Sequence, residues 1–219
     1  MIAEIQDADP SLEIVVVDDG SADGTAEAAL GAGARVVRLP YNLGIGAAVQ
    51  TGFQYARDRG FDVAVQIDGD GQHDPRELPR LLGPVLAGDA DLVVGTRFGG
   101  PSLYRGSLAR RVGIGIFARA VSAIVGRRIT DTTSGFRAAG RRAIELFAAE
   151  YPHDYPEVEA TVLVFRHRLR LLEVPVAMRH RASGRSSITP LRSVYYMTKV
   201  SLALFVGLFR RRPAWEQSL

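Results

Sequence analysis

The sequence predicts an α/β fold with a mostly parallel sheet and helices on both of its faces. Three observations lead to this fold class. Short apolar runs rich in β-branched residues alternate with longer stretches of helical periodicity, and this alternation is typical of parallel strands joined by right-handed crossovers. Several of these runs end in turns rich in aspartate and glycine. The 219 residues are 47% hydrophobic, which is ample for a core.

The first hundred residues contain four predicted strands, each followed by a turn. The chain begins with the end of a helix and a turn at residues 1–10. The strands are expected at residues 12–17, 35–39, 62–66 and 90–95. A short alanine-rich helix is expected after residue 25, a longer one from the turn at 42–46 to about residue 59, and a third at 75–86, where Pro75 suits the first helical position.

The chain changes character after the break at residues 99–101. Residues 131–141 are predicted to form a loop that runs into a short strand. A further strand is expected at 171–178, where Pro175 favours a sheet edge or a bulge because it cannot donate to a ladder. The basic, small and polar stretch 179–190 is predicted to be a mobile loop. Helices are expected at 107–125, 142–150, 157–168 and 194–209.

The stretch IDGDGQHDP, residues 67–75, follows a buried strand and is the strongest candidate for a ligand site. Open α/β sheets bind ligands at the carboxyl ends of their strands. Asp68 and Asp70, with Gln72 beside them, offer hard oxygen ligands for Mg²⁺ or Mn²⁺, a kind of cation that shares its shell with water and substrate phosphates. The alternative is an ordinary polar Asp-Gly turn between a strand and a helix.

A second polar turn, Asp18-Asp19-Gly20-Ser21, follows the strand at 12–17. Its carboxylates and hydroxyl can accept hydrogen bonds from a base NH or ribose hydroxyls. Helix capping would explain the serine but not the pair of aspartates. The turn from Asn42 to Gly46, which includes Gly44, is typical of a phosphate cradle, although its glycines are equally consistent with close packing of a helix on a strand.

Charge divides the chain into an acidic and a basic half. Residues 1–100 carry 7 basic and 16 acidic side chains, and residues 101–219 carry 20 and 8. This asymmetry indicates one cationic and one anionic ligand. The planar fork of Arg97, just past a strand end, is suited to a phosphate or diphosphate. Four further arginines could together neutralise a phosphorylated acceptor, although each one alone is an ordinary surface charge: Arg110, Arg111, Arg181 and Arg185.

Composition excludes several classes of chemistry. The chain contains no cysteine, which excludes disulfides, thiolate catalysis and zinc–sulfur sites. No secretory signal is visible at the start, and no apolar run reaches the ~20 residues that a spanning helix needs. Glu157 and Glu159 open a predicted helix, where they suit either the helix dipole or a catalytic role.

Eight motifs, taken in order, resemble the family 2 glycosyltransferases of the GT-A fold, in particular the branch that glycosylates dolichol or polyprenol phosphate. They span about residues 12–190 with gaps similar to those of the family. The matching stretches are IVVVDDGSADGT (14–25), NLGIGAAVQTGF (42–53), IDGDGQHDP (67–75), VVGTRF (93–98), DTTSGFRA (131–138), PEVEA (156–160), LLEVPV (171–176) and ASGRSS (182–187).

The resemblance implies a role for each matching residue. The turn from Asp18 to Ser21 and residues Asn42 and Gly44 would contact the nucleotide sugar, and Asp68, Asp70 and Gln72 would hold Mg²⁺ or Mn²⁺ on its diphosphate. Arg97 and Ser134, with an arginine of the pair Arg110/Arg111, would meet the acceptor phosphate. Arg181 and Arg185 would close over the donor diphosphate. Asp70 and Arg97 would be catalytic, and so would Glu157 if the acceptor were a hydroxyl.

The implied reaction is inverting transfer of a hexose from a nucleotide-diphosphate sugar to a polyprenyl phosphate in cell-envelope glycan synthesis. The implied partners are therefore the donor, the acceptor and an anionic membrane surface, with no nucleic acid. Two alternatives stay open. One is a glycosyltransferase that uses a saccharide or other hydroxyl acceptor, and the other is a remnant that binds nucleotide sugars without catalysis.

Two departures from the family shape the expected domain organisation. The family's first strand, which ends in a Pro-x-x-Asn-Glu-like motif and lies inside the sheet, has no counterpart in this sequence. We therefore expect an unstable chain, or one that draws the strands at 12–17 and 62–66 together. Residues 1–190 are expected to form the GT-A domain. Residues 191–219 are expected to form an amphipathic helix on the cytoplasmic face of a membrane, with a packed terminal helix as the alternative.

Overall fold

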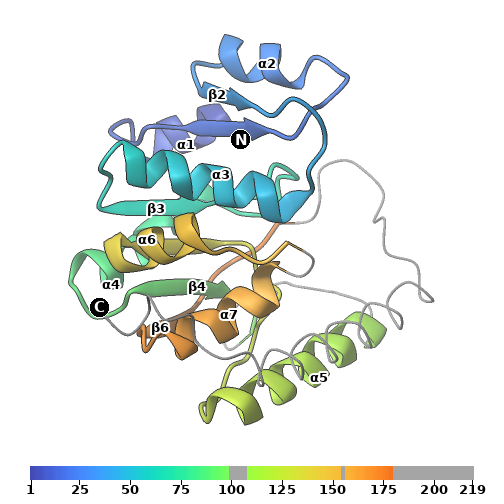
Figure 1. Cartoon of the computed structure of the whole chain (residues 1–219), viewed down its shortest axis with the longest axis vertical. Coiled ribbons are helices and arrows are strands. Elements are labelled where there is room, and N and C mark those ends of the chain that lie inside the picture. Colours follow the sequence, from blue (N-terminus) through green and yellow to red (C-terminus); the bar gives the residue numbers. More distant parts are fainter. Residues whose placement is uncertain (99–107, 154–155, 180–219) are drawn as a thin grey trace. The chain divides into compact units, whose positions relative to one another are not determined.

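The computed structural model describes residues 1–98, 108–153 and 156–179, except for the side chains of residues 108–113 and 117. Six strands lie in this part: β1 (Val15–Asp18), β2 (Arg35–Arg38), β3 (Val63–Gln66), β4 (Leu92–Thr96), β5 (Arg137–Gly140) and β6 (Leu171–Pro175). They alternate with α1 (Ile2–Ala8), α2 (Thr25–Gly31), α3 (Ile45–Asp58), the 3₁₀ turn η1 (Pro75–Glu77), α4 (Leu78–Leu86), α5 (Leu108–Val125), α6 (Arg141–Ala149) and α7 (Pro156–Arg166) (Figure 1).

The main sheet has four strands in the order β3-β5-β4-β6. The strands β3, β4 and β6 run in one direction, because β4 pairs with β6 in parallel and both β3 and β4 pair with β5 in antiparallel register. The predicted α/β class with mostly parallel strands is confirmed, and the one reversed strand is the short β5 that was expected after the loop at 131–136.

The last strand is shorter than expected, and the prediction that it extends to residue 178 is wrong. Pairing with β4 ends at Pro175, opposite Thr96. Proline has no N–H to continue the ladder. After it, the Val176 N–H donates to the Thr96 carbonyl at 3.1 Å, and the Arg179 N–H donates to the Gln72 carbonyl at 2.8 Å. Met178 then bridges to His73 as an isolated pair, which brings this segment against the acidic turn that follows β3.

The strands β1 and β2 form a separate parallel pair. No ladder joins β1 to β3 among the described residues, so the expectation that these two strands come together is wrong. The helix α3 connects the two sheets, since it contacts both β1 and β3 and packs extensively on α6. Its buried face carries Phe53 and Ala56, and the ring of Phe53 lies 5.0 Å from that of Phe147 on α6.

The helices α4 and α6 cover opposite faces of the main sheet (Figure 1). Successive strand residues point to opposite faces, so neighbours such as Leu92 and Val93 supply both layers. Leu81 and Leu78 of α4 share a core with Val93 and Ala138. Each such fully buried aliphatic side chain contributes about 1.5–3 kcal/mol relative to an exposed one, and this burial fixes the strand ends that carry the polar turns.

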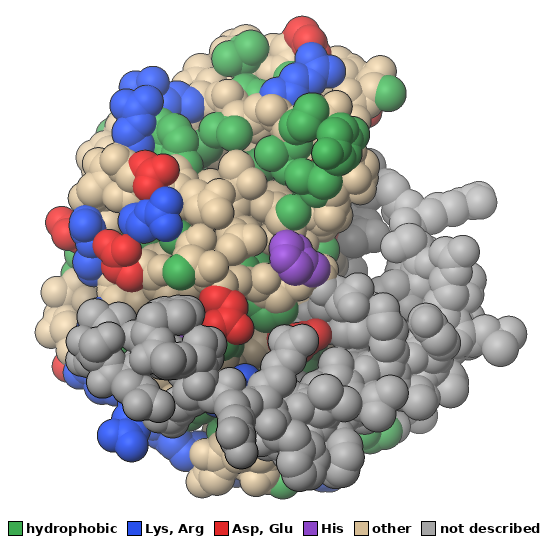
Figure 2. Space-filling view, viewed as in Figure 1, with side chains coloured by type: hydrophobic (Ala, Val, Ile, Leu, Met, Phe, Trp, Pro, Cys, Tyr) green, Lys and Arg blue, Asp and Glu red, His purple; other side chains and the backbone are tan. Residues whose placement is uncertain are grey.

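The surface of this part of the molecule is rich in neighbouring charges of opposite sign. Figure 2 shows basic and acidic side chains lying together on one face, and exposed pairs such as Arg57–Asp58 and Arg141–Glu145 account for several contacts of this kind.

Among the described helices, none combines the length and the hydrophobicity needed to cross a bilayer. The chain divides into Met1–Gly184 and Arg185–Leu219. The second unit, with the predicted terminal helix, lies outside the described residues, and the predicted boundary at residue 190 stays a prediction.

Candidate active site

The turn after β1 is held by hydrogen bonds to its own neighbours. Asp18 is buried, and its Oδ1 accepts a bond of 2.9 Å from the Ser21 N–H. Its Oδ2 lies 3.4 Å from the Arg38 guanidinium. Hydrogen bonding from Ser21, together with the charge of Arg38, lowers the pKa of Asp18 although burial acts to raise it. Asp18 is therefore an anion at neutral pH that protein donors already stabilise.

Asp19 joins this turn to the turn at residues 42–46. Its two carboxylate oxygens accept the N–H groups of Leu43, at 2.7 Å, and Gly44, at 2.9 Å. Both oxygens thus hold the start of α3. The predicted contact of Asp19 with a nucleotide would have to be made in addition to these bonds.

Glycines allow these two turns to approach closely. Gly20 has φ +70°, and a Cβ there would lie 2.6 Å from the Tyr41 carbonyl carbon. A Cβ at Gly46 would lie 2.4 Å from the Pro152 carbonyl oxygen, so the start of α3 abuts the loop that precedes α7. Gly46 therefore does serve close packing, but against this loop and not against a strand as the packing interpretation expected. Contacts of Asn42 and Gly44 with a nucleotide sugar stay a prediction.

The acidic turn after β3 has a different environment. The Asp68 side chain is 38% exposed, and its backbone N–H donates to Nδ1 of the buried His73 at 3.1 Å. The proton of this histidine is therefore on Nε2, which lies 3.7 Å from an Asp68 oxygen. Burial lowers the pKa of His73 to about 4, so the ring is neutral. It stacks on Phe136 with centroids 4.7 Å apart, which fixes the turn on the main sheet.

The carboxylate of Asp68 is poorly neutralised by the protein. Burial raises its pKa, and the charge of Asp70 raises it further, against the opposing influence of Arg137 and Arg97. Asp70 in turn accepts the Gln72 N–H at 3.0 Å, which places the two aspartates and Gln72 in one tight turn. Two carboxylates that repel each other at a partly open turn fit a divalent cation, because the cation removes the repulsion.

This fit depends on a small set of ligands. Within the described residues, no three His, Asp or Glu side chains converge as a metal cluster. The candidate set is therefore the pair Asp68 and Asp70 with Gln72, as the sequence predicts. A Mg²⁺ or Mn²⁺ ion bound by one or two carboxylates takes its other ligands from water and substrate phosphates.

Gly135 forms the other wall of this turn. A Cβ at this position would lie 2.7 Å from both carboxylate oxygens of Asp68. The backbone of the loop at 131–136 thus lies directly against the candidate metal ligand. Only glycine allows this approach.

Arg97 is buried at the end of β4 and bonded to the same loop. Its Nε and Nη2 donate to the two oxygens of Asp131 at 2.7 and 2.6 Å, and Nη2 also bonds the Thr133 hydroxyl. Burial acts to raise the pKa of Asp131, but the hydrogen bonds and charge of Arg97 outweigh it and lower this pKa. The sequence leads us to expect an Arg97 fork that faces a phosphate. In the structure this face of the fork binds Asp131 instead.

Ser134 and Arg137 connect the loop to α7. Ser134 is buried, and its carbonyl accepts Arg137 Nε at 2.8 Å. Arg137 Nη2 donates to the Glu157 carbonyl at 2.7 Å, at the start of α7. The remaining nitrogen, Nη1, is buried and has no hydrogen-bond partner among the described residues. A buried cation with an unused donor thus lies between the acidic turn and Glu157.

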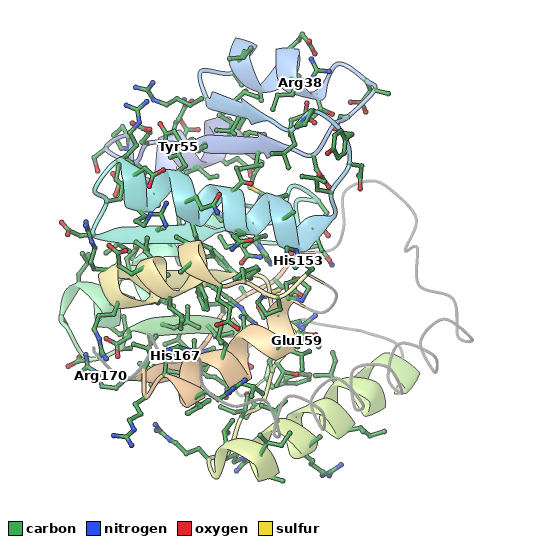
Figure 3. All side chains as sticks on the ribbon, in the orientation of Figure 1. Arg38, Tyr55, His153, Glu159, His167 and Arg170 are labelled. Atoms are coloured by element: carbon green, nitrogen blue, oxygen red, sulfur yellow. The ribbon has the colours of Figure 1, made fainter. Side chains whose placement is uncertain are left out.

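Glu157 occupies the first turn of α7 together with Glu159, as predicted. Figure 3 shows Glu159 on this helix and His153 on the preceding loop. Burial raises the pKa of Glu157, whereas the nearby charge of Arg137 lowers it and that of Asp68 raises it. The charges of Arg137 and Arg97 act to lower the pKa of both Asp68 and Glu157. The two carboxyl groups therefore share one electrostatic environment.

Four of the predicted arginines cannot be placed by side chain. Arg110 and Arg111 belong to α5, but their side chains lie outside the described residues, as do Arg181 and Arg185 altogether. Their predicted contacts with phosphates stay predictions.

Several residues that build the site were given no role from the sequence. His73 and Gly135 flank Asp68, and Asp131 binds Arg97. Arg137 lies between Asp68 and Glu157, and Glu173 of β6 accepts the N–H groups of Thr130 and Asp131 at 2.8–3.0 Å. The sequence does contain a signal, namely polar residues within or at the ends of otherwise apolar strands. This signal does not indicate which partner each residue contacts.

Comparison with known proteins gives a consistent result. Residues 2–146 match the family model described as glycosyl transferase family 2. An undecaprenyl-phosphate mannosyltransferase of Micrococcus luteus is 34% identical over 197 residues, which cover 86% of this chain and 80% of the relative. A polyprenol monophosphomannose synthase of Mycolicibacterium smegmatis is also 34% identical, over 86% of this chain and 75% of the relative.

Solved structures agree on the fold. A crystal structure of glucosyl-3-phosphoglycerate synthase from Mycobacterium tuberculosis, in complex with Mn²⁺ and uridine-diphosphate-glucose, superposes with a TM-score of 0.61. The match covers 94% of this chain and 82% of that chain at 23% sequence identity. This likeness supports the α/β architecture in which the acidic turns lie at strand ends.

Proposed function

The chain belongs to glycosyl transferase family 2 and is a glycosyltransferase of the polyprenyl-phosphate type, and from this premise we propose that it transfers a hexose from a nucleotide-diphosphate sugar to a polyprenyl phosphate. The transfer depends on a divalent cation and inverts the anomeric carbon. It serves cell-envelope glycan synthesis at the cytoplasmic face of a membrane.

The observation that carries this proposal is a series of contacts that joins five segments: the turns after β1 and β3, the 42–46 turn, the loop at 131–136 and the loop before α7. The turn after β1 binds the 42–46 turn through Asp19, and Gly46 packs against the loop before α7. Arg137 links the start of α7 to the loop at 131–136, which lies against Asp68 at Gly135. These contacts join the polar turn after β1, the pair Asp68 and Asp70, and the loop that carries the buried Arg97–Asp131 ion pair into one continuous site.

The residues divide the work according to their charge. The turn from Asp18 to Ser21 accepts hydrogen bonds from the base and ribose of the donor, next to the 42–46 turn. Asp68, Asp70 and Gln72 hold the cation, which when bound offsets the charge of the departing nucleotide diphosphate. An oxygen of the acceptor phosphate attacks the anomeric carbon as the bond to the diphosphate breaks.

The loop at 131–136, which carries Ser134, is fixed in advance by the buried ion pair between Arg97 and Asp131. Arg97 and Asp131 hold residues 131–134, and Arg137 and Glu173 bind the same loop from either side. Ser134 and the nearby guanidinium groups of Arg97 and Arg137 then form the acceptor-phosphate site. Arg110 or Arg111 adds positive charge to this site. Arg181 and Arg185 close over the donor diphosphate. Because such preorganised donors need no rearrangement during reaction, their electrostatic effect is large.

The second candidate is transfer to a hydroxyl acceptor, and one observation favours it. Burial raises the pKa of Glu157, and a carboxyl with a raised pKa suits a general base. An acceptor phosphate is already ionised at neutral pH and needs no such base. The two candidates therefore differ in their dependence on Glu157.

We assign the membrane contact to residues 194–219, where Tyr195 and Tyr196 suit the headgroup level and residues 210–212 are arginines. Deleting residues 194–219 should release the protein from anionic vesicles into the supernatant. Salt-insensitive binding that survives the deletion would contradict this assignment.

A donor panel tests the proposal. The purified chain is incubated with nucleotide sugars, with Mn²⁺ or Mg²⁺ and a short polyprenyl phosphate, and the products are separated by mass. A cation-dependent glycosyl phosphopolyprenol supports the proposal. A product formed only with hydroxyl acceptors supports the second candidate, and donor binding with no product indicates a binding remnant.

A further inference from the structure

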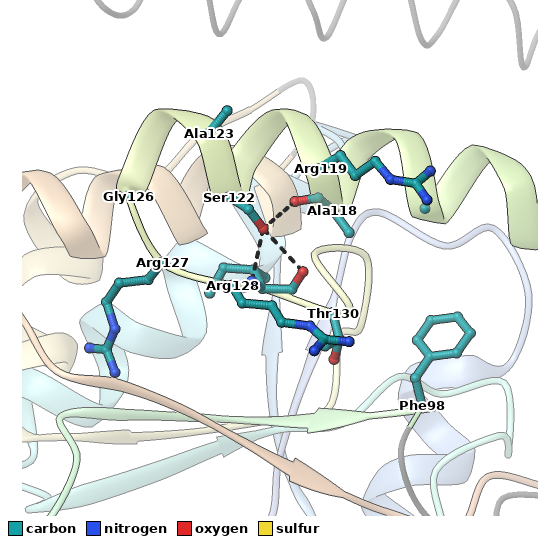
Figure 4. A pocket seen from close by; sticks show the side chains of 11 residues that line it. Phe98, Ala118, Arg119, Ser122, Ala123, Gly126, Arg127, Arg128 and Thr130 are labelled. Carbon is teal, nitrogen blue, oxygen red and sulfur yellow. Dashed lines mark hydrogen bonds between the residues drawn. The ribbon is translucent and has the colours of Figure 1, made fainter.

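An open groove lies beside the second half of α5. The groove has a volume of about 1050 Å³, and its walls are the end of α5 and the segment 126–130, with Phe98 at one end (Figure 4). The Ser122 hydroxyl donates to the Ala118 carbonyl at 2.6 Å and accepts the Ile129 N–H at 2.9 Å. These bonds fix the segment 126–130 against the helix, so the groove is a built feature of the fold.

The groove has a basic rim and a small-residue lining. Arg119, Arg127 and Arg128 are exposed and line it, and no acidic residue does. Small side chains such as Ala118 and Ala123 make up much of the remaining wall. Over the described residues, none of the three arginines takes part in an ion pair. This contrasts with other surface arginines, such as Arg57 and Arg141, which pair with carboxylates.

The acidic groups nearest to the groove are already satisfied. Thr130 belongs to the lining, and Glu173 accepts its backbone N–H and hydroxyl. The same carboxylate also accepts the Asp131 N–H, and the Asp131 carboxylate binds Arg97. The dipole of α5 favours cations just past the helix end, which suits Arg127 and Arg128, but it does not account for Arg119 on the helix itself.

We propose that this groove binds the phosphate-bearing headgroup of an anionic membrane lipid. Three exposed guanidinium groups around an open groove, none of them ion-paired with a described residue, complement such a headgroup in charge and in hydrogen-bonding geometry. Phe98, at one end of the groove, follows Arg97, whose guanidinium binds Asp131 of the loop at 131–136. A lipid bound in the groove therefore holds the acceptor side of the site at the bilayer surface, independently of residues 194–219.

Vesicle sedimentation with the full chain tests this inference. The double variant Arg127→Gln/Arg128→Gln should bind phosphatidylglycerol vesicles about 30-fold more weakly than the unchanged chain, and Arg119→Gln about fivefold more weakly. Each basic residue near an anionic surface contributes about 1 kcal/mol, and 1.4 kcal/mol is tenfold in affinity. The matched control Arg57→Gln/Arg59→Gln removes the same charge from the end of α3 and should bind as the unchanged chain does.

Three results would overturn the inference. Unchanged vesicle binding by the double variant would place the lipid contact elsewhere. Equal losses in the double variant and its control would show an effect of net charge alone. Displacement from vesicles by excess inorganic phosphate at constant ionic strength would identify a site for free phosphate. Because the readout is binding rather than turnover, it is independent of whether the proposed transfer occurs.

Discussion

The two acidic turns of this protein have similar sequences and opposite electrostatic states. In the turn after β1, Asp18 and Asp19 receive hydrogen bonds from Ser21, Leu43 and Gly44, and the pKa of Asp18 is lowered. In the turn after β3, the N–H of Asp68 is bonded but its carboxylate is crowded by Asp70 and by the backbone at Gly135, and its pKa is raised.

The difference indicates which turn needs a partner from outside the chain. A carboxylate that backbone amides already satisfy can be structural and still accept bonds from a ribose. A carboxylate whose pKa is raised by burial and by a like charge is stabilised by a cation. The comparison therefore supports the proposal that the divalent cation binds at the turn after β3 and not at the turn after β1.

The largest effect is expected at the buried ion pair beside the second turn. Arg97→Met should lower the free energy of unfolding by about 3–5 kcal/mol, because it leaves Asp131 buried without its cation. Urea denaturation measures this. The exposed pair Arg141–Glu145 supplies the control, since Arg141→Met should cost less than about 1 kcal/mol. Equal, small losses for both variants would show that Asp131 does not depend on Arg97.

A reciprocal pair of aspartate variants tests the comparison itself. Asp70→Ala should weaken Mn²⁺-dependent binding of a nucleoside diphosphate by more than about 100-fold with little change in melting temperature. Asp19→Ala should lower the free energy of unfolding by about 1–2 kcal/mol, because two amides lose their acceptor. Calorimetry and thermal melting measure the two effects. Unchanged affinity in Asp70→Ala would remove the metal assignment.

A pair of glycine variants sharpens the same contrast. In Gly135→Ala the new methyl group displaces Asp68, so affinity for Mn²⁺ and nucleotide should fall about 10–100-fold. In Gly20→Ala the new methyl group meets the backbone at Tyr41, and residue 20 must keep its left-handed conformation. The free energy of unfolding should therefore fall by about 1–3 kcal/mol. If Gly135→Ala bound cation and nucleotide normally, Asp68 would not be a ligand in the geometry described.

The smallest effect is expected for Glu157→Gln. With a polyprenyl phosphate acceptor the variant should lose less than about tenfold in turnover, because an anionic nucleophile needs no deprotonation. Loss of a general base costs ~10²–10⁴-fold. Steady-state rates with phosphate and hydroxyl acceptors decide between transfer to a polyprenyl phosphate and transfer to a hydroxyl acceptor. A loss in that higher range, with donor affinity kept, favours the hydroxyl acceptor.

Local patterns in the sequence were sufficient for the approximate positions of the described strands and helices, apart from the end of β6, and for the location of both acidic turns. They could not give the pairing of residues far apart in the chain. The pairing of Arg97 with Asp131 was missed, and a phosphate was expected in its place. The reason is that Asp131 lies 34 positions away, in a segment with the sequence features of a loop. Periodicity reports which face of an element is buried, but not which loops meet where elements end.

The glycines show the same limit. Gly20 and Gly46 were visible as turn residues, whereas the contact of Gly135 with Asp68 follows from the way β5 crosses the sheet between β3 and β4. The antiparallel direction of β5 was not predicted. It results from tertiary pairing, and a four-residue strand carries no signal of its direction.

The helix α3 contacts both β1 and β3 and packs on α6, whereas no strand pairing joins the two sheets among the described residues, and this has a consequence for cooperativity. Ladder hydrogen bonds do not cross between the two sheets in the described part of the chain, so the β1–β2 unit can open without disrupting β3 to β6. Native-state hydrogen exchange should therefore resolve two cooperative units, with the amides of residues 15–18 and 35–38 exchanging at a lower opening free energy than those of β4. The turn proposed to bind the nucleotide would then belong to the less stable unit, and the turn proposed to bind the cation to the more stable one. Donor binding, which needs both turns, would then slow exchange in the first unit far more than in the second.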